Sequence, residues 1–223
     1  MNNEMNNERN NDDRRFKGTT TIGIKCRDGV ILGSEKRVTL GFTRFAKEKK
    51  TYKIDDNVWI TGAGASADLL KVAQILTIEY KLFKTRNGRK MTIKSMSSLF
   101  SNILYQQKMF PFLVVTILGG VEEDGTPIIY AFDAYGAGSV DNYFSHGSGM
   151  QSALAILDDG YKETSTVKEN IPLAIKAINA AMDRDIFSGD AIELIVITKS
   201  GYKEYSEEDT KKILEKEKEE RKK

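Results

Sequence analysis

The sequence predicts an α+β protein in which two packed antiparallel sheets lie between two pairs of helices, a four-layer αββα sandwich. Two observations carry this prediction. Strand-like segments fall into three blocks, and a pair of helical segments separates each block from the next. Each helix pair then has a sheet face against which its apolar side can be buried. A chain of 223 residues suits one domain with one substantial core.

The first eighteen residues form a polar leader. Asparagine pairs recur every four residues, at positions 2–3, 6–7 and 10–11. Such a segment buries no apolar surface, so we expect it to be disordered. It also lacks the apolar stretch of a secretory signal. We therefore divide the chain into a propeptide of residues 1–18 that is cut off, a folded domain of residues 19–206 and a charged tail of residues 207–223.

The first strand block contains two predicted hairpins. Residues 19–26 and 30–34 are joined by Arg27-Asp28-Gly29, and an Asp-Gly pair is typical of a hairpin turn. Residues 52–54 and 58–61 form a second pair around Asp55-Asp56-Asn57. These four strands are predicted to make the first antiparallel layer.

Two amphipathic helices follow. The first is predicted to open within residues 62–68 and to end at Asn87-Gly88, because its apolar residues keep a three-and-four spacing. The second keeps the same spacing and ends before Pro111. The apolar positions are Leu69, Val72, Leu76, Tyr80 and Phe83 in the first helix and Met96, Leu99, Phe100, Ile103 and Leu104 in the second. This pair is expected to cover one sheet face.

The rest of the chain repeats the scheme. Strands are predicted over residues 112–118, 128–133 and 142–146, helices over 150–161 and 167–185, and strands over 192–197 and 202–205. The tail carries seven acidic and seven basic residues. Such a tail forms either a solvated helix or a frayed end.

Composition excludes several classes of function. The 34 basic and 32 acidic side chains nearly cancel, which argues against a nucleic-acid groove or an anionic membrane partner. His146 is the single histidine and has no Gly-x-Ser-x-Gly elbow, so it is expected to be a surface or strand-end residue. Cys26 has no disulfide partner, which fits a reducing cytoplasm. Zinc spacings, Walker loops and dinucleotide motifs are missing, so we expect no metal or cofactor.

The junction of Gly18 and Thr19 is predicted to be a cleavage site. If that bond is cut, Thr19 carries a hydroxyl nucleophile and a free α-amine on the same Cα. An α-amine has a pKa of roughly 7.7–8.0, so it can accept the hydroxyl proton without help from a histidine. Thr19 to Thr21 could alternatively be ordinary β-branched strand residues.

Several motifs together resemble the β-subunits of the archaeal and eukaryotic 20S proteasome. They are Gly18-Thr19-Thr20-Thr21, Lys50-Thr51-Tyr52-Lys53-Ile54, Gly64, Met109-Phe110-Pro111-Phe112, Gly147-Ser148-Gly149 and Arg184-Asp185-x-x-Ser188-Gly189. The resemblance extends from Gly18 to about Tyr205. It implies the N-terminal-nucleophile hydrolase fold and a threonine endopeptidase, made as a proprotein, that acts on unfolded proteins. The implied partners are other β-subunits in a seven-membered ring, a ring of α-subunits and, indirectly, an ATPase regulatory particle.

The same resemblance implies the site residues. Thr19 matches the nucleophile, and its freed amine the base. Lys50 matches the lysine whose charge lowers the proton affinity of that hydroxyl and amine. Gly64 matches the residue whose backbone N–H stabilises the oxyanion. The group that holds the amine by hydrogen bonds would be Ser148, Asp185 and Ser188.

Three of these assignments have alternatives. The loop before Lys50 is one residue shorter than in archaeal relatives, so Lys49 is a second candidate for the lysine. Lys49 and Lys50 end the charged segment that starts at Lys47, and such a segment is ordinarily a solvent-exposed face. Gly147-Ser148-Gly149 could be a plain turn, and Asp185 and Ser188 could be helix-end and turn residues.

The chain departs from the family at Glu35. Where the family has an aspartate that pairs with the lysine, this chain reads Ser34-Glu35-Lys36-Arg37. The carboxylate is kept, but one methylene is added in a site that tolerates errors of about 0.5 Å. A weakly active or purely structural β-subunit of a mixed ring is therefore the alternative function. An amidase acting on a small molecule is a third, which the length of the resemblance disfavours.

The resemblance also implies a substrate pocket. Its residues are Val38, Thr39, Glu48, Gly62, Gly64 and Ser66. A glycine at position 62 is expected to leave the pocket roomy. Glu48, if it points inward, would favour a basic residue before the cut.

Overall fold

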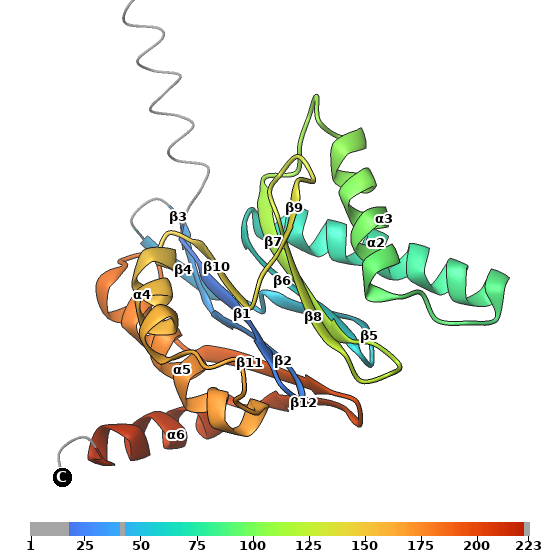
Figure 1. The fold of residues 1–223 in the computed structure, drawn as a ribbon. Helices are drawn as coiled ribbons and strands as arrows, with labels where there is room; N and C mark the ends of the chain where they lie inside the picture. Colours follow the sequence, from blue (N-terminus) through green and yellow to red (C-terminus); the bar gives the residue numbers. More distant parts are fainter. Residues whose placement is uncertain (1–17, 41–42, 221–223) are drawn as a thin grey trace, which may run out of the picture.

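The computed structural model describes residues 18–40 and 43–220 and shows four layers, with two sheets between two sets of helices (Figure 1). The predicted α+β sandwich is confirmed. The expected propeptide, apart from Gly18, lies outside the described residues.

One sheet has the strand order β10-β1-β2-β11-β12, and all neighbours are antiparallel. Its strands are β1 (Thr20–Cys26), β2 (Gly29–Glu35), β10 (Tyr143–Gly147), β11 (Ile192–Thr198) and β12 (Gly201–Tyr205). The Asp28-Gly29 turn joins β1 to β2 as predicted. Both strands are almost entirely buried, because they lie in the middle of the sheet with layers on both faces.

The other sheet has the order β5-β6-β7-β8-β9 and is also antiparallel. Its strands are β5 (Thr51–Asp55), β6 (Val58–Gly64), β7 (Val114–Val121), β8 (Pro127–Phe132) and β9 (Gly138–Val140). The two sheets pack face to face through a cluster that includes Leu32, Trp59, Ile117, Ile129 and Ile195. This cluster forms the central layer of the core.

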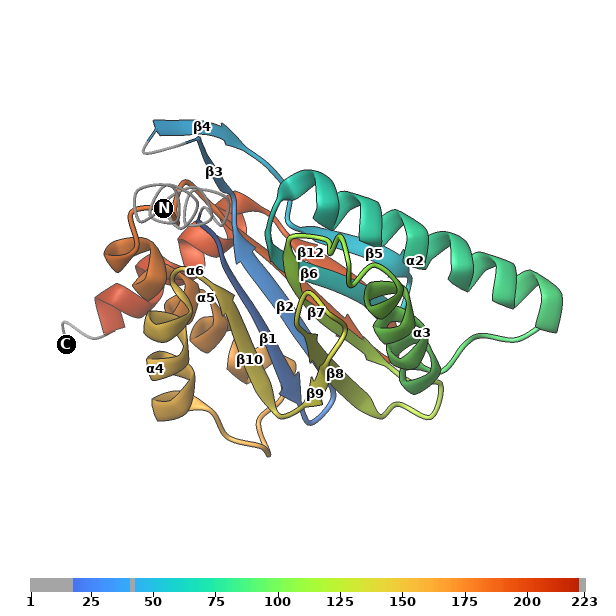
Figure 2. The same cartoon turned by 90° about the horizontal axis from the view of Figure 1, so that it is seen from above.

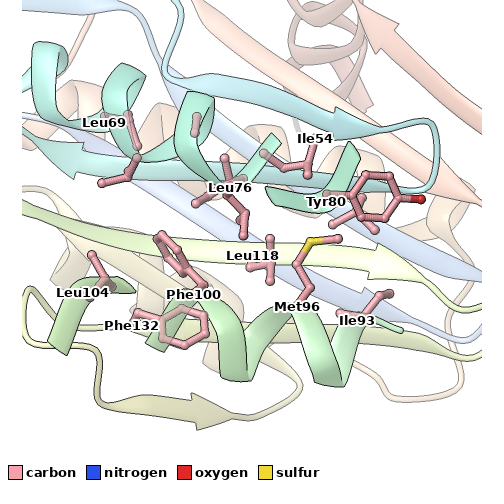
Figure 3. Close-up of a cluster of buried hydrophobic side chains, with 14 of the residues drawn as sticks. Ile54, Leu69, Leu76, Tyr80, Ile93, Met96, Phe100, Leu104, Leu118 and Phe132 are labelled. Atoms are coloured by element: carbon pink, nitrogen blue, oxygen red, sulfur yellow. The ribbon is translucent and has the colours of Figure 1, made fainter. Parts of the chain in front are cut away.

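Helices α2 (Ser66–Asn87) and α3 (Ile93–Gln106) cover the second sheet. Figure 3 shows their apolar faces meeting over Leu118, with Tyr80, Met96 and Phe100 fully buried. Gly88 ends α2 in the left-handed conformation, at φ 64°. The predicted apolar faces of both helices are therefore those that pack.

Helices α4 (Met150–Gly160) and α5 (Val167–Arg184) cover the first sheet, on the opposite side of the molecule (Figure 2). A capping box of Thr166 and Glu169 begins α5. The tail forms helix α6 (Glu207–Glu220), which contacts α5 and β11 and buries Thr210. Ile213 and Leu214 of α6 pack on the apolar cluster between the first sheet and helices α4 and α5, so the described tail is a helix with one packed side rather than a frayed end.

Two features of the prediction were wrong, namely the grouping of the first strands into one layer and the number of strands. Helix α2 begins at Ser66, within the predicted opening at residues 62–68, and residues 62–64 before it belong to β6 and pair with β7. The four strands of the first block do not form one layer, because β1 and β2 lie in one sheet and β5 and β6 in the other. Strands β3 (Arg37–Leu40) and β4 (Thr43–Lys47) were missed, as was β9. All three are short, and β4 and β9 are mostly exposed, so they lack a core-facing pattern.

Candidate active site

Thr19 directly precedes β1 and is buried, with 4% of its surface exposed. Its hydroxyl donates a hydrogen bond to the carbonyl oxygen of Gly18 at 2.7 Å. Gly18 has φ 57°, in the left-handed region that favours glycine. The hydroxyl of Thr19 thus lies against the peptide bond that the sequence marks for cleavage.

Glu35, the last residue of β2, forms a buried ion pair with Lys50, which directly precedes β5. The Lys50 ammonium also donates to the carbonyl of Arg37 at 2.7 Å. The carboxylate of Glu35 accepts backbone N–H groups as well, from Arg37 at 2.6 Å, Gly189 at 2.9 Å and Thr20 at 3.4 Å. Both carboxylate oxygens of Glu35 are therefore engaged. One of them accepts the N–H of Thr20, the residue that follows Thr19.

Burial affects both members of this pair. It lowers the pKa of Lys50 below its ordinary value and raises that of Glu35, and each partner's charge opposes the effect on the other. A lysine whose pKa is lowered in this way releases its proton more readily than a surface lysine. Such a group can supply positive charge or donate a proton near the start of β1.

A hydrogen-bonded set of side chains lies at the start of β1. The hydroxyl of Ser148 donates to Asp185 and lies 3.5 Å from the carbonyl oxygen of Thr19. Ser188 donates to the same Asp185 oxygen at 2.6 Å and bonds the hydroxyl of Thr20 at 2.8 Å. Ser148 follows β10 and Asp185 caps α5 at its C-terminus, so two distant segments meet at the start of β1.

A cleft of about 200 Å³ opens beside Thr19. Its lining residues are Gly18, Thr19, Ala63, Gly64, Val115, Gly147 and Ser148. Gly64 has φ 127° and Gly147 has φ 99°, conformations that other residues rarely adopt. A Cβ atom on Gly147 would lie 1.8 Å from the Thr19 carbonyl oxygen. These glycines let the backbone come close to Thr19 and keep the cleft open.

The remaining predicted residues lie outside the lining of this cleft. Lys49 is exposed and donates to Glu204 at 2.9 Å. Among the proposed pocket residues, Val38 and Thr39 are half-buried on β3, Glu48 is exposed and Ser66 begins α2. A Cβ atom on Gly62 would lie 2.8 Å from a methyl group of Leu69, so that helix residue occupies the adjoining space.

The two other residues considered from the sequence have simple surroundings. His146 lies on β10, and burial lowers its pKa. Burial raises the pKa of Cys26 to about 12, so its thiol stays protonated and is a poor nucleophile. Among the described residues no group of three metal-ligating side chains occurs.

Sequence reasoning missed three residues at the site. Thr20, the first residue of β1, bonds the hydroxyl of Ser188, and Glu35 accepts the N–H of Gly189. Glu193 of β11 is buried and accepts the backbone N–H of Lys50 at 3.2 Å. The sequence does contain an indication of Glu193, because it is the single charged residue in the apolar segment Ala191–Ile197.

Two antiparallel sheets between helix layers, with a buried threonine at the start of a central strand, define the sandwich of the N-terminal-nucleophile hydrolases. The profile of the family described as "Proteasome subunit" matches residues 16–197. The chain belongs to this family. Family membership places it among peptidases and implies assembly with other proteasome subunits.

Several relatives of the chain are β-type subunits from archaea. "Proteasome subunit beta 2" of Pyrococcus abyssi is 41% identical over 201 residues, which cover 90% of this chain and 96% of that protein. "Proteasome subunit beta" of Archaeoglobus profundus is 42% identical, covering 91% of this chain and 94% of the relative. The protein of the same name from Methanococcoides burtonii is 44% identical, covering 85% and 91%. The resemblance to archaeal proteasome β-subunits is therefore confirmed.

None of the five helices in the described residues has both the length and the apolar composition needed to cross a bilayer.

Proposed function

We propose that this chain is a catalytic β-subunit of a 20S proteasome core, a threonine endopeptidase that exposes its own nucleophile by cutting the Gly18–Thr19 bond. The observation that supports this most directly is the 2.7 Å contact between the Thr19 hydroxyl and the Gly18 carbonyl. The hydroxyl lies beside the bond that it must attack. Glu35 of the buried Lys50–Glu35 pair accepts the N–H of Thr20, the next residue along the chain.

In leader removal, the Thr19 hydroxyl oxygen attacks the Gly18 carbonyl carbon and loses its proton. The C–N bond then breaks, the nitrogen takes up a proton, and Gly18 is left as an ester on the Thr19 side chain. Water hydrolyses the ester, which gives a Gly18 carboxylate and a Thr19 that carries a free α-amine. The first step needs no other chain, because nucleophile and carbonyl belong to adjacent residues.

The mature site repeats this chemistry on a substrate. The α-amine takes the hydroxyl proton while the oxygen attacks the substrate carbonyl, and the proton then passes to the leaving nitrogen. The N–H of Gly64 would stabilise the oxyanion, because Gly64 lines the cleft beside Thr19. Hydrolysis of the acyl ester frees the enzyme.

The other groups assist the nucleophile and its amine. The Lys50 charge lowers the proton affinity of the hydroxyl, and Glu35 holds Lys50 in place. Ser148, Asp185 and Ser188 would hold the amine by hydrogen bonds once it is free. Their mutual bonds already support this arrangement.

The proposed setting is a cytoplasmic particle. We expect seven-membered β rings stacked with α-subunit rings and supplied with unfolded proteins by an ATPase regulator. Mass spectrometry of assembled rings tests the central claim: a mature chain that begins at Thr19, together with peptide hydrolysis by rings of this subunit alone, supports it. An intact leader and no hydrolysis would favour the second candidate function, a structural β-subunit in a mixed ring. The observation behind this second candidate is Glu35, which stands where the family has an aspartate.

Glu35→Asp is expected to lower the rate of peptide hydrolysis by about tenfold, which corresponds to about 1.4 kcal/mol. Both oxygens of Glu35 are bound, and the backbone N–H groups of Arg37 and Gly189 fit the longer side chain. Aspartate would draw back by about one C–C bond, roughly 1.5 Å, and leave Lys50 poorly paired. Steady-state kinetics of the two proteins check this.

The direction of the Glu35→Asp effect separates the two candidate functions. A fall in rate is expected of a protease adapted to glutamate. A rise would mean that the extra methylene impairs the site and that the subunit serves mainly as ring structure. An unchanged rate would contradict the pairing of Glu35 with Lys50.

We further propose that Val38, Thr39, Glu48, Gly62, Gly64 and Ser66 contribute to substrate binding. Glu48 is exposed and negatively charged, so a basic residue before the cut is expected to be favoured by a factor of several. Fluorogenic peptides that end in Arg, Leu and Asp test this. A preference for Asp would contradict it, and Glu48→Gln should remove a preference for Arg.

A further inference from the structure

Glu193 is a buried carboxylate that joins the two sheets at the lysine of the site. It lies on β11 of the first sheet and has 4% of its surface exposed. Its Oε2 accepts the backbone N–H of Lys50, at the start of the second sheet, at 3.2 Å. A carboxylate in such a position requires a partner, because burial of an unpaired charge is costly.

This bond completes the support of Lys50. The carbonyl oxygen of Lys50 accepts the hydroxyl of Thr61 at 3.0 Å and the N–H of Gly62 at 3.3 Å. The side chain is held by Glu35 and by the carbonyl of Arg37. The backbone of Lys50 is therefore fixed on both sides, and Glu193 holds its N–H.

The second oxygen of Glu193 points toward Lys49. Oε1 has no hydrogen bond with another described residue and lies 4.0 Å from the Lys49 ammonium, which also binds Glu204. The two adjacent lysines therefore face two different carboxylates. Lys50 pairs with Glu35 inside the protein, and Lys49 balances Glu193 from the surface.

Glu193 also acts on the charge of Lys50. The charged groups that face the Lys50 ammonium are Glu35 from β2, Glu193 from β11 and Glu48 from the segment before β5. Each raises the pKa of Lys50 against the burial that lowers it. Removal of the charge at position 193 should thus make Lys50 easier to deprotonate.

We propose that Glu193 is a positioning residue of the threonine peptidase, which fixes the backbone of Lys50 and stabilises its ammonium group. This inference rests on the proposed function of the site. A role in folding alone is the competing explanation, because Glu193 would tie the sheets together in an inactive subunit as well.

Two variants separate the geometric from the electrostatic contribution. Glu193→Gln keeps an oxygen that can accept the Lys50 N–H but loses the charge, whereas Glu193→Ala loses both. We expect Glu193→Ala to lower kcat for peptide hydrolysis at least about tenfold, because small displacements of a supporting group cost that much or more. Glu193→Gln should stay within about threefold of wild type at pH 7.

The pH profile distinguishes positioning from folding. Since the ammonium form of Lys50 is the active one, the alkaline limb of kcat should move down by about 0.5 to 1 pH unit in Glu193→Gln. Glu204→Gln is the matched control, because it removes a carboxylate from the outer side of Lys49 and should leave that limb unmoved. An unmoved limb in Glu193→Gln overturns the electrostatic role.

Hydrogen exchange tests the geometric role without any need for activity. Mass spectrometry of the peptide that contains residues 48–54 should show faster exchange of one amide in Glu193→Ala but not in Glu193→Gln. Equal exchange in wild type and Glu193→Ala overturns the positioning role, whether or not the rings hydrolyse peptides. Wild-type rings that neither process their leader nor hydrolyse peptides would instead refute the proposed function.

Discussion

Thr19→Ala is expected to abolish both leader removal and peptide hydrolysis, with a loss of at least about 10⁴-fold, while the subunit still folds and assembles. In the proposed mechanism the Thr19 hydroxyl is the attacking atom in both reactions. Its removal costs one hydrogen bond, to Gly18, which contributes only about 1 kcal/mol to stability. Intact-mass measurement and a fluorogenic peptide assay on assembled rings read out the two losses.

The matched control is Thr19→Ser, which keeps the hydroxyl and, after cleavage, the amine. It should retain appreciable activity, although loss of the methyl group lets the side chain rotate more freely. Leader removal by Thr19→Ala at the wild-type rate, with no active partner subunit present, would refute Thr19 as the nucleophile. Equal loss in both variants would indicate a packing effect rather than a chemical one.

Local signals in the sequence were enough to predict the four-layer fold class and to select many residues of the candidate site. The apolar spacing of α2 and α3 predicted the faces that cover the second sheet, since helix period depends only on neighbours along the chain. The Gly18-Thr19 junction, Ser148, Asp185 and Ser188 were selected by motif, and the structure brings them within hydrogen-bonding reach of one another or of Thr20.

The missed features depend on long-range pairing. Strands β2 and β5 are close in sequence but belong to different sheets. The alternation of residues within a strand does not indicate with which other strand it pairs. For the same reason the contact between Glu193 and Lys50, which are 143 positions apart, was not predicted. A charged residue in an apolar strand indicates that a partner for the buried charge exists, but the sequence does not identify that partner.

Glu35 illustrates how the structure changes an interpretation. In the sequence its extra methylene counted against activity. In the structure Glu35, at the end of β2, pairs with Lys50 and also accepts the backbone N–H groups of Arg37 and Gly189. Such full use of a carboxylate is what a working ion pair requires, because a buried charge with unsatisfied oxygens destabilises the fold.

Lys50→Ala is expected to reduce peptide hydrolysis by about 10²-fold or more, because it removes the positive charge that lowers the proton affinity of the Thr19 hydroxyl and amine. Lys49→Ala is the matched control. Lys49 is exposed and pairs with Glu204 and Glu193, so its loss should change the rate by less than about threefold. Kinetics of the two variants compare adjacent lysines directly.

Lys50→Ala should also destabilise the subunit, because it leaves Glu35 buried without its cation. Breaking a buried pair in this way costs about 3–5 kcal/mol. Burial already raises the pKa of Glu35, and loss of Lys50 should raise it further. The folded variant then binds a proton that the unfolded chain has released, so its stability should fall as pH rises above the ordinary glutamate range. Thermal unfolding at pH 5 and pH 8 measures this.

The double variant Lys50→Met, Glu35→Gln separates stability from catalysis. Both charges are gone, so the pH dependence of unfolding that arises from Glu35 should vanish and most of the lost stability should return. Peptide hydrolysis should stay as low as in Lys50→Ala, because a neutral site still lacks the charge that activates Thr19. Recovery of activity along with stability would show that Lys50 acts by holding the fold, and loss of activity in Lys49→Ala alone would assign the lysine's role to position 49.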